Sequence, residues 1–306
     1  MKKCTIIYNP NSGKKNIKPH LPKITDILNK QKYEVEIIPT KYKGHATEIV
    51  EALSNVDLVM SFGGDGTFNE VMTGNIRRKE RLLLTHIPVG TTNDIGAMLG
   101  YGKNIIENVK LSLKGVVKKF DIGLINNHPF IYVAGIGKFT NLSYETPRDL
   151  KKKIGHLAYI GEGLRAFFQK TKLYDISYEV EGKEYRGLFS LVLISNANHI
   201  AGIKNVYKDM KLDDNKFEIV FCNIRKKKDI FKTLYFLTMY DKTQVPGIYF
   251  YKTDKIKLKI NNNEDKNWCI DGEELEKSND NTYTIETLNN IEILIPKKNI
   301  NKLFIN

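Results

Sequence analysis

Three glycine-containing loops carry the residue types that phosphate binding requires. They are Asn9-Pro10-Asn11-Ser12-Gly13, Gly63-Gly64-Asp65-Gly66-Thr67 and Gly90-Thr91-Thr92-Asn93-Asp94. Glycine lets the backbone come close to a bulky anion, whose phosphates can then be held by backbone N–H groups. One Gly-Gly-Asp-Gly segment is often only a turn, but three such loops in the first hundred residues favour a phosphate site.

The second loop also precedes a predicted helix. Thr67–Met72 has the pattern of a helix start, so the partial positive charge of the helix N-terminus would face the same phosphates. Neither the Walker A pattern nor G-x-G-x-x-G occurs in the sequence. A P-loop ATPase and a dinucleotide-dependent dehydrogenase are therefore disfavoured.

The elements that position these loops follow from hydrophobic periodicity. Short β-rich runs alternate with helical patterns at Thr5–Tyr8, Ile24–Leu28, Val35–Ile38, Ile49–Leu53, Leu58–Ser61 and Leu82–Val89. Such alternation predicts βαβ units and a parallel sheet, whose ligand sites lie at the carboxyl ends of the strands. Because each loop follows a predicted strand, we expect the three loops to converge on one edge of the sheet.

The rest of the chain has a different pattern, with short strand-like runs separated by polar turns. The runs are Ile131–Ala134, Ile176–Val180, Phe189–Ile194, Phe217–Phe221, Ile256–Ile260 and Tyr283–Thr287, with helical patterns at Thr146–Lys170 and Asp229–Tyr240. This spacing suggests an antiparallel sandwich or barrel. We predict a Rossmann-like α/β domain over 1–122 and a β-sandwich domain over 123–290. Ile291–Ile295, followed by Pro296, reads as a strand whose domain the pattern does not settle, and the segment 291–306 could pack back on the first domain.

Composition limits the function classes. The chain has 306 residues, 41% hydrophobic and 27% charged, with a net charge of +13, which favours phosphate-rich partners such as nucleic acid, nucleotides or anionic lipid. No apolar run approaches the roughly 18 residues of a membrane-spanning helix. The three cysteines have no zinc spacing, and the first apolar run is too short for a signal peptide. We expect a cytoplasmic protein.

Several lysine-rich clusters could contact an anionic membrane surface. They are Lys14-Lys15 with Lys18, Lys151–Lys153 and Arg225–Lys228. Each basic residue near such a surface can contribute about 1 kcal/mol, although a lysine run is more often only a solvated face.

These motifs resemble those of the diacylglycerol kinase catalytic family. The resemblance rests on Asn9-Pro10-x-Ser12-Gly13, Gly63-Gly64-Asp65-Gly66-Thr67-x-Asn69-Glu70 and Gly90-Thr91-x-Asn93-Asp94. It extends through Ser143–Pro147, Gly155-x-x-Ala158-Tyr159, Lys211–Asp214 and Asp271–Glu273, which are similar to segments of bacterial soluble diacylglycerol kinases. It implies a kinase that transfers the γ-phosphate of ATP to diacylglycerol, with Mg²⁺ as cofactor. Relatives of this size are often dimers, so a homodimer is also implied.

The resemblance implies which residues bind ATP, in a cleft between the two domains. They are Asn9, Pro10, Asn11, Ser12, Gly13, Thr40, Gly64, Asp65, Gly66, Thr67, Phe68, Asn69, Glu70 and Thr91. The sequence pattern supports only the phosphate loops, and Thr40 rests on the resemblance alone. Asp65 is expected to act with Asp94 at the magnesium–nucleotide end of the site.

Two further acidic segments gain roles from the same resemblance. Asp271-Gly272-Glu273 reads locally as a polar turn after a strand, but in the family it faces the γ-phosphate. Glu273 and Asp271 are therefore candidates for the catalytic base, ranked above Asp65. A structural Mg²⁺ is implied at the Asp214 carboxylate with the carbonyls of Lys211 and Lys216, although Asn215 stands where the family usually has Gly.

Other functions remain open. The ATP-binding loops are shared with sphingosine kinases and, more distantly, with NAD kinases, so the acceptor is not fixed by them. The basic charge also fits a nucleic-acid-binding protein, although no zinc spacing, RNP-type aromatic run or helix-turn-helix pattern accompanies it. A kinase fold without activity is the third alternative.

Overall fold

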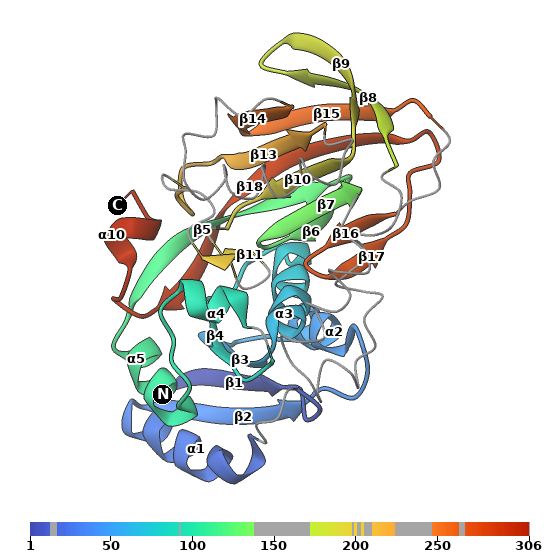
Figure 1. Ribbon diagram of the computed structural model, residues 1–306. Coiled ribbons are helices and arrows are strands. Elements are labelled where there is room, and N and C mark those ends of the chain that lie inside the picture. Colours follow the sequence, from blue (N-terminus) through green and yellow to red (C-terminus); the bar gives the residue numbers. More distant parts are fainter. Residues whose placement is uncertain are drawn as a thin grey trace. The chain divides into compact units, whose positions relative to one another are not determined.

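The computed structural model describes residues 1–12, 17–91, 93–137, 172–197, 199–200, 203–204, 210–223, 247–262 and 267–305 (Figure 1). The chain divides into two compact units. Unit 1 contains Met1–Phe120, Lys211–Asp213 and Asn289–Asn306, and unit 2 contains Asp121–Met210 and Asp214–Leu288. The helices that the sequence predicted over Thr146–Lys170 and Asp229–Tyr240 lie outside the described residues.

Unit 1 is built on a parallel sheet with strand order β2-β1-β3-β4. The strands are β1 (Lys2–Tyr8), β2 (Tyr33–Pro39), β3 (Leu58–Gly63) and β4 (Leu84–Pro88), and the second half of β18 (Thr282–Ile295) pairs with β4 in parallel. Tyr8 pairs with Pro39 on one side and Phe62 on the other, and Gly63 pairs with Pro88. The four strands β1 to β4 therefore end together at one edge.

Helices cover both faces of this sheet. Unit 1 contains η1 (Lys18–His20), α1 (Leu21–Lys30), α2 (His45–Ala52), α3 (Asp65–Arg77), α4 (Asp94–Met98), α5 (Ile105–Leu113) and α10 (Ile300–Leu303). Helices α1 and α5 contact each other, as do α2 and α3, and Figure 1 shows the two pairs on opposite sides of the strands. Because both faces are covered, every residue of β3 and β4 is buried, as expected for strands inside a parallel α/β sheet. None of the described helices is long and apolar enough to cross a membrane.

Unit 2 contains two antiparallel layers. One has β8 (Tyr174–Val180), β9 (Lys183–Phe189), β15 (Lys255–Ile260) and the first half of β18, which also pairs with β5 (Val116–Ile125) and through it with β6 (His128–Phe130). The other has β14 (Ile248–Thr253), β13 (Phe217–Cys222), β10 (Leu191–Ser195), β7 (Val133–Gly137), β16 (Trp268–Ile270) and β17 (Glu273–Leu275), in that order. A short hairpin joins β11 (His199–Ile200) to β12 (Ile203–Lys204).

The core of unit 2 lies between these layers. Strand β15 alternates exposed lysines with buried Ile256, Leu258 and Ile260, the period expected of a strand with one face on the core. These side chains join one buried cluster with residues of the second layer, among them Phe217, Ile219 and Trp268. The combination of a parallel α/β sheet and an antiparallel sandwich confirms the predicted fold class.

Two details of the predicted strands were wrong. Phe189–Ile194 is not one strand, because the chain changes sheets at Ser190: β9 pairs with β8 in one layer and β10 with β7 and β13 in the other. Conversely, Tyr283–Thr287 and Ile291–Ile295 belong to one continuous strand, β18, whose two halves lie in different units. Residue propensity cannot reveal either feature, because both depend on pairing partners far away in the sequence.

Candidate active site

The three glycine-containing loops meet in unit 1. The Gly64 N–H donates to Ser12 Oγ at 2.9 Å, which joins the first loop to the second. The Gly90 N–H donates to Gly63 O at 3.1 Å, which joins the third loop to the second. Loops that are far apart in the sequence therefore form one hydrogen-bonded group at the carboxyl edge of the sheet.

Close backbone contact explains why glycine is needed where the loops touch. A Cβ atom on Gly90 would lie 2.5 Å from Gly64 Cα, far inside van der Waals contact, whereas a Cβ on Gly66 would meet nothing within 4 Å. Gly90 is therefore required for loop packing. At Gly66 the open space leaves room for a bulky anion to approach the backbone.

Asp65 clamps the third loop to the second. Its side chain is buried, and its carboxylate accepts hydrogen bonds from the backbone N–H groups of Asp94 at 3.0 Å and Ile95 at 3.2 Å. These donors belong to the first turn of α4, whose orphan N–H groups favour a negative charge. Asp65, the first residue of α3, thereby fixes the start of α4 against α3.

The remaining residues implied for ATP binding fall into two groups. Asn9, Pro10, Asn11, Ser12 and Thr91 lie in loops at the carboxyl edge, where Pro10, Asn11 and Thr91 are exposed. The buried Thr40 joins this edge from β2, because its N–H donates to Tyr8 O at 2.8 Å. Gly13 lies outside the described residues.

The second group lies on α3 and holds that helix in place. Thr67 and Phe68 are buried, and Asn69 Oδ1 accepts a hydrogen bond from Thr73 Oγ1 at 3.4 Å. Glu70 Oε2 accepts the Ala46 N–H of α2 at 3.2 Å. The family resemblance places these α3 residues in the same nucleotide-binding set as the loop residues, and that role stays a prediction.

A buried histidine supports the start of α3, and sequence reasoning missed it. His86 on β4 stacks on Phe68 with ring centroids 4.7 Å apart, and its Nδ1 lies 2.9 Å from Ser61 Oγ. Burial lowers the pKa of His86 to about 3, so the ring is neutral near pH 7. Its position within an apolar strand gave no signal that distinguishes it from an ordinary core residue.

In unit 2, Asp271 and Gly272 form the tight turn between β16 and β17. Both have positive φ, 48° and 87°, which is the type I′ geometry that Asp-Gly favours in two-residue hairpins. The buried Asp271 carboxylate accepts the N–H groups of Ile131, Tyr132 and Val133 at 2.6, 3.1 and 2.9 Å. Glu273 is partly exposed at the start of β17.

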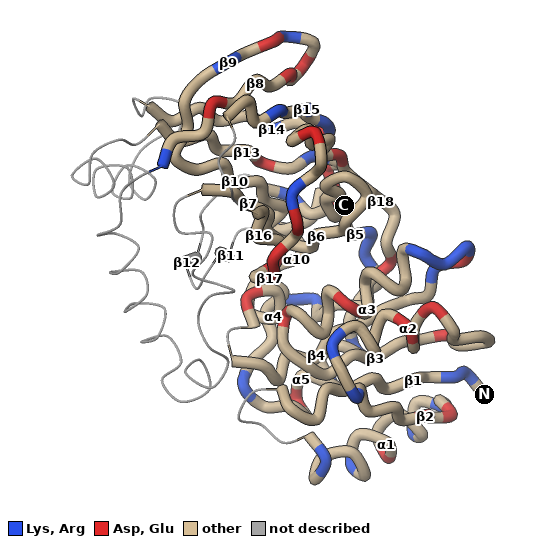
Figure 2. The backbone as a smooth tube through the Cα atoms, turned by 90° about the vertical axis from the view of Figure 1, so that its right-hand side faces the viewer, with Lys and Arg blue, Asp and Glu red and all other residues tan. Residues whose placement is uncertain are grey.

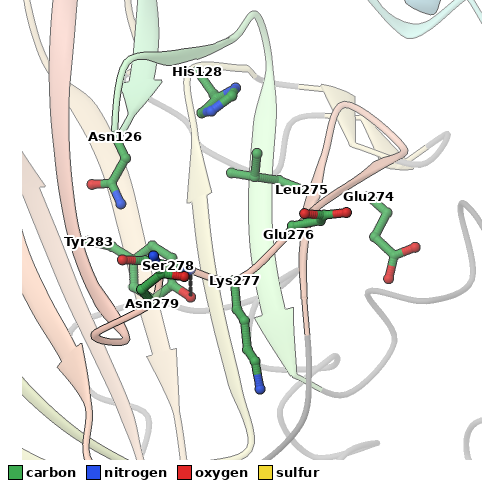
Figure 3. A pocket seen from close by; sticks show the side chains of 9 residues that line it. All are labelled: Asn126, His128, Glu274, Leu275, Glu276, Lys277, Ser278, Asn279 and Tyr283. Carbon is green, nitrogen blue, oxygen red and sulfur yellow. Dashed lines mark hydrogen bonds between the residues drawn. The ribbon is translucent and has the colours of Figure 1, made fainter.

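An open hollow of about 650 Å³ adjoins this hairpin within unit 2 (Figure 3). Its wall comes from the β5–β6 turn and from the segment after Glu273: Asn126, His128, Glu274, Leu275, Glu276, Lys277, Ser278, Asn279 and Tyr283. Several of these polar groups already have protein partners. The Asn126 side chain donates a hydrogen bond to Thr282 O and accepts one from the Thr284 N–H. The Ser278 N–H donates to Tyr283 Oη at 3.2 Å.

Residues Asp214–Lys216, the Asp214 loop, directly precede β13 in unit 2. Asn215 has φ 58°, a left-handed conformation that Asn adopts more readily than most residues. Asp214 Oδ1 accepts the Lys216 N–H at 3.1 Å, and Asp214 Oδ2 lies 2.6 Å from Lys252 Nζ. No cluster of three or more His, Cys, Asp or Glu side chains with metal-site geometry occurs in the part of the chain that the structure describes.

Two charged residues beside Asp214 were not predicted. Lys252 also lies 3.4 Å from Glu218 Oε1, and burial raises the pKa of Glu218 to about 7 against the opposing effect of Lys252. Both lie on strands, and β14 was not predicted at all. Lys211, which was grouped with Asp214, lies in unit 1, where its Nζ donates to the carbonyls of Asn301, Lys302 and Phe304.

Comparison with known proteins places this geometry in a family. The model of the diacylglycerol kinase catalytic domain matches residues 3–125, which contain the three loops. A diacylglycerol kinase of Bacillus subtilis is 32% identical over 89% of this chain and 90% of its own length. Diacylglycerol kinases of Staphylococcus epidermidis and Staphylococcus aureus are 34% and 33% identical over 98% and 100% of this chain, and 94% and 96% of their own.

Solved structures agree. A crystal structure of a Bacillus anthracis protein has a TM-score of 0.79 at 27% identity and covers 97% of both chains. A second structure, of a diacylglycerol kinase from the same organism, has a TM-score of 0.76 at 24% identity and supports the fold. With relatives above 30% identity over nearly its whole length, the chain belongs to the diacylglycerol kinase family of ATP-dependent lipid kinases.

Proposed function

We propose that this chain transfers the γ-phosphoryl group of ATP to the free hydroxyl of diacylglycerol and so forms phosphatidic acid. The main structural support for this proposal is the junction of the three loops through Ser12, Gly64 and Gly90. Relatives that are named diacylglycerol kinases and align with nearly the whole chain support the choice of acceptor.

The phosphate loops of unit 1 would bind the donor, ATP as its magnesium complex. Gly66 leaves space beside its backbone, and the N-terminus of α3 begins at the same place, so N–H groups and the helix dipole would stabilise the phosphates. Asp65, which is occupied by two N–H groups, would act on this site by holding α4 in position. Magnesium would neutralise phosphate oxygens during transfer.

Glu273 is the preferred catalytic base. It would accept the proton of the acceptor hydroxyl as that oxygen bonds to the γ-phosphorus and the bond to ADP breaks. The Asp271 carboxylate already accepts three backbone N–H groups, so its role would be to fix the hairpin that carries Glu273. A well-placed general base typically contributes about 10²- to 10⁴-fold in rate.

Membrane contact would bring the enzyme to its lipid. The chain carries a net charge of +13, and among the described residues Lys and Arg occur in both units (Figure 2), which would favour peripheral association with an anionic bilayer from the cytoplasm. A homodimer is proposed on the resemblance alone. The clusters Lys151–Lys153 and Arg225–Lys228 lie outside the described residues.

A lipid panel tests the proposal. Purified protein is given ATP with a radiolabelled γ-phosphate, magnesium and mixed micelles containing diacylglycerol, monoacylglycerol or sphingosine. The expected result is labelled phosphatidic acid as the main product. A strong preference for sphingosine would replace the acceptor, and retention of RNA or DNA on filters at moderate salt without any lipid phosphorylation would overturn the kinase assignment.

A further inference from the structure

The Asp214 loop of unit 2 is paired with a cation from the neighbouring strand β14. Lys252 Nζ lies 2.6 Å from Asp214 Oδ2 and 3.4 Å from Glu218 Oε1. We propose that this ammonium group is the resident counter-ion of the loop, which therefore keeps its conformation without a bound divalent metal.

The sheet register fixes the lysine in place. Lys252 on β14 pairs directly with Glu218 on β13, which pairs in turn with Ser195 on β10. Residues directly opposite each other in an antiparallel sheet point to the same face, so these three side chains form a row across the strands. Asp214 reaches the end of that row from the loop that leads into β13. The ammonium is thus positioned by the fold.

Because its groups are largely buried, the ion pair should contribute to the stability of the loop. The side chains of Asp214 and Glu218 are only 13% and 3% exposed, and that of Lys252 is 30% exposed. In such surroundings a carboxylate without a counter-charge lowers the free energy of unfolding, and opposite charges attract each other more strongly than in water. Lys252 supplies one positive charge directly at the Asp214 carboxylate.

The contacts of Asp214 do not fit a magnesium ion at the same time. Mg²⁺ binds oxygen ligands at roughly 2.0–2.1 Å in octahedral geometry and takes few protein ligands. Here Asp214 Oδ1 accepts the Lys216 N–H and Oδ2 accepts Lys252 Nζ. A divalent ion at Asp214 would lie beside the ammonium and be repelled by it, so it would have to displace Lys252.

Nearby oxygen atoms define the rival explanation. Among the described residues, Ser195 Oγ, Asn196 Oδ1 and Glu218 Oε2 are buried without a hydrogen-bond partner. Buried polar atoms normally have partners, and either water molecules or the hydration shell of a metal would satisfy them. If a metal fills this place, the protein with Lys252 intact should bind a metal ion that is lost when Asp214 is replaced. If water fills it, no such ion should be found.

The test is a Mn²⁺ titration followed by electron paramagnetic resonance on the full-length, nucleotide-free protein. Wild type is compared with Asp214→Asn, Lys252→Met and the matched control Lys255→Met, which removes a lysine whose ion pair with Glu286 is exposed. Thermal unfolding with Mg²⁺ or a chelator is the second readout. Neither measurement depends on kinase activity, so failure here is distinguishable from failure of the proposed function.

We expect wild type, Lys255→Met and Asp214→Asn to bind the same number of Mn²⁺ ions, because none binds at Asp214. Wild type and Lys255→Met should also have the same Tm in Mg²⁺ as in chelator. Lys252→Met should unfold about 5–10 °C lower, gain one Mn²⁺ and recover part of its Tm in Mg²⁺. A single Mn²⁺ bound by wild type and lost in Asp214→Asn would overturn the proposal. That comparison is decisive even where Lys252→Met fails to fold.

Discussion

Asp65 in unit 1 and Asp271 in unit 2 are buried aspartates that do similar work in different surroundings. Asp65 accepts two N–H groups from the first turn of a helix, whereas Asp271 accepts three from the bend that leads into β7 and occupies a left-handed turn. Each fixes a loop that carries another residue of the proposed site. The comparison teaches that an acid in a motif proposed to face phosphate can act through the backbone segment that it holds.

The largest expected effect separates Glu273 from the aspartate beside it. Glu273→Gln should lower kcat by about 10²- to 10⁴-fold, because the proposed general base is lost. The Tm and the KM for ATP should stay unchanged, since Glu273 is partly exposed and lies outside the phosphate loops. Steady-state kinetics and a thermal melt measure both. Wild-type kcat in Glu273→Gln would exclude this residue as the base.

Asp271→Asn should instead lower stability together with activity. An Asn side chain keeps one acceptor oxygen but turns an NH2 group toward an N–H group that the second carboxylate oxygen now accepts, so about 2–3 kcal/mol of unfolding free energy should be lost. Chemical denaturation measures this loss. The exposed turn residue Asp280 provides the control, Asp280→Asn, for which we expect a much smaller change. A fully stable Asp271→Asn with reduced kcat would show that Asp271 takes part in the chemistry directly.

Asp65→Asn should affect the nucleotide more than the acceptor. Releasing the first turn of α4 would loosen the third loop, so the KM for ATP should rise by about 10-fold while the KM for diacylglycerol changes little. Kinetics with each substrate varied in turn distinguish the two. An unchanged KM for ATP would break the parallel between the two aspartates.

The smallest effect concerns His86 and pH. Its folded-state pKa of about 3 lies below the ordinary value of 6.5, so the unfolded chain binds more protons between these values and stability falls as pH drops below 6.5. The loss should approach 1.4 kcal/mol per pH unit, roughly, as an upper bound. His86→Gln should lose less stability than wild type between about pH 7 and about pH 5 in denaturation experiments. Equal losses would remove His86 as the cause.

The sequence predicted the elements that local pattern determines. The alternation of strands and helices in the first hundred residues predicted β1 to β4 and their loops, because the buried strands β3 and β4 are short, mainly apolar runs that lead into glycine-containing turns. The Asp-Gly turn was also readable, since its residue types suit only a few backbone conformations.

The features that depend on distant partners were not readable. Nothing near Lys252 indicates that it pairs with Asp214, because the pair exists only once β14 lies beside β13. The change of sheets at Ser190 and the division of β18 between the units have the same origin. The hydrogen bonds that occupy Asp65 and Asp271 likewise come from segments that no local pattern connects to them.

Equilibrium binding of magnesium–ATP, measured by calorimetry, tests the central claim most directly. The claim is that the three loops form one phosphate site, and Gly90→Ala should disrupt it because a Cβ there lies 2.5 Å from Gly64 Cα. Gly102→Ala is the control, since its Cβ would meet only Asn108 Oδ1 at 3.9 Å. We predict that wild type and Gly102→Ala bind alike and that Gly90→Ala binds at least about 10-fold more weakly. Wild-type affinity in Gly90→Ala, or no binding by wild type, would contradict the account.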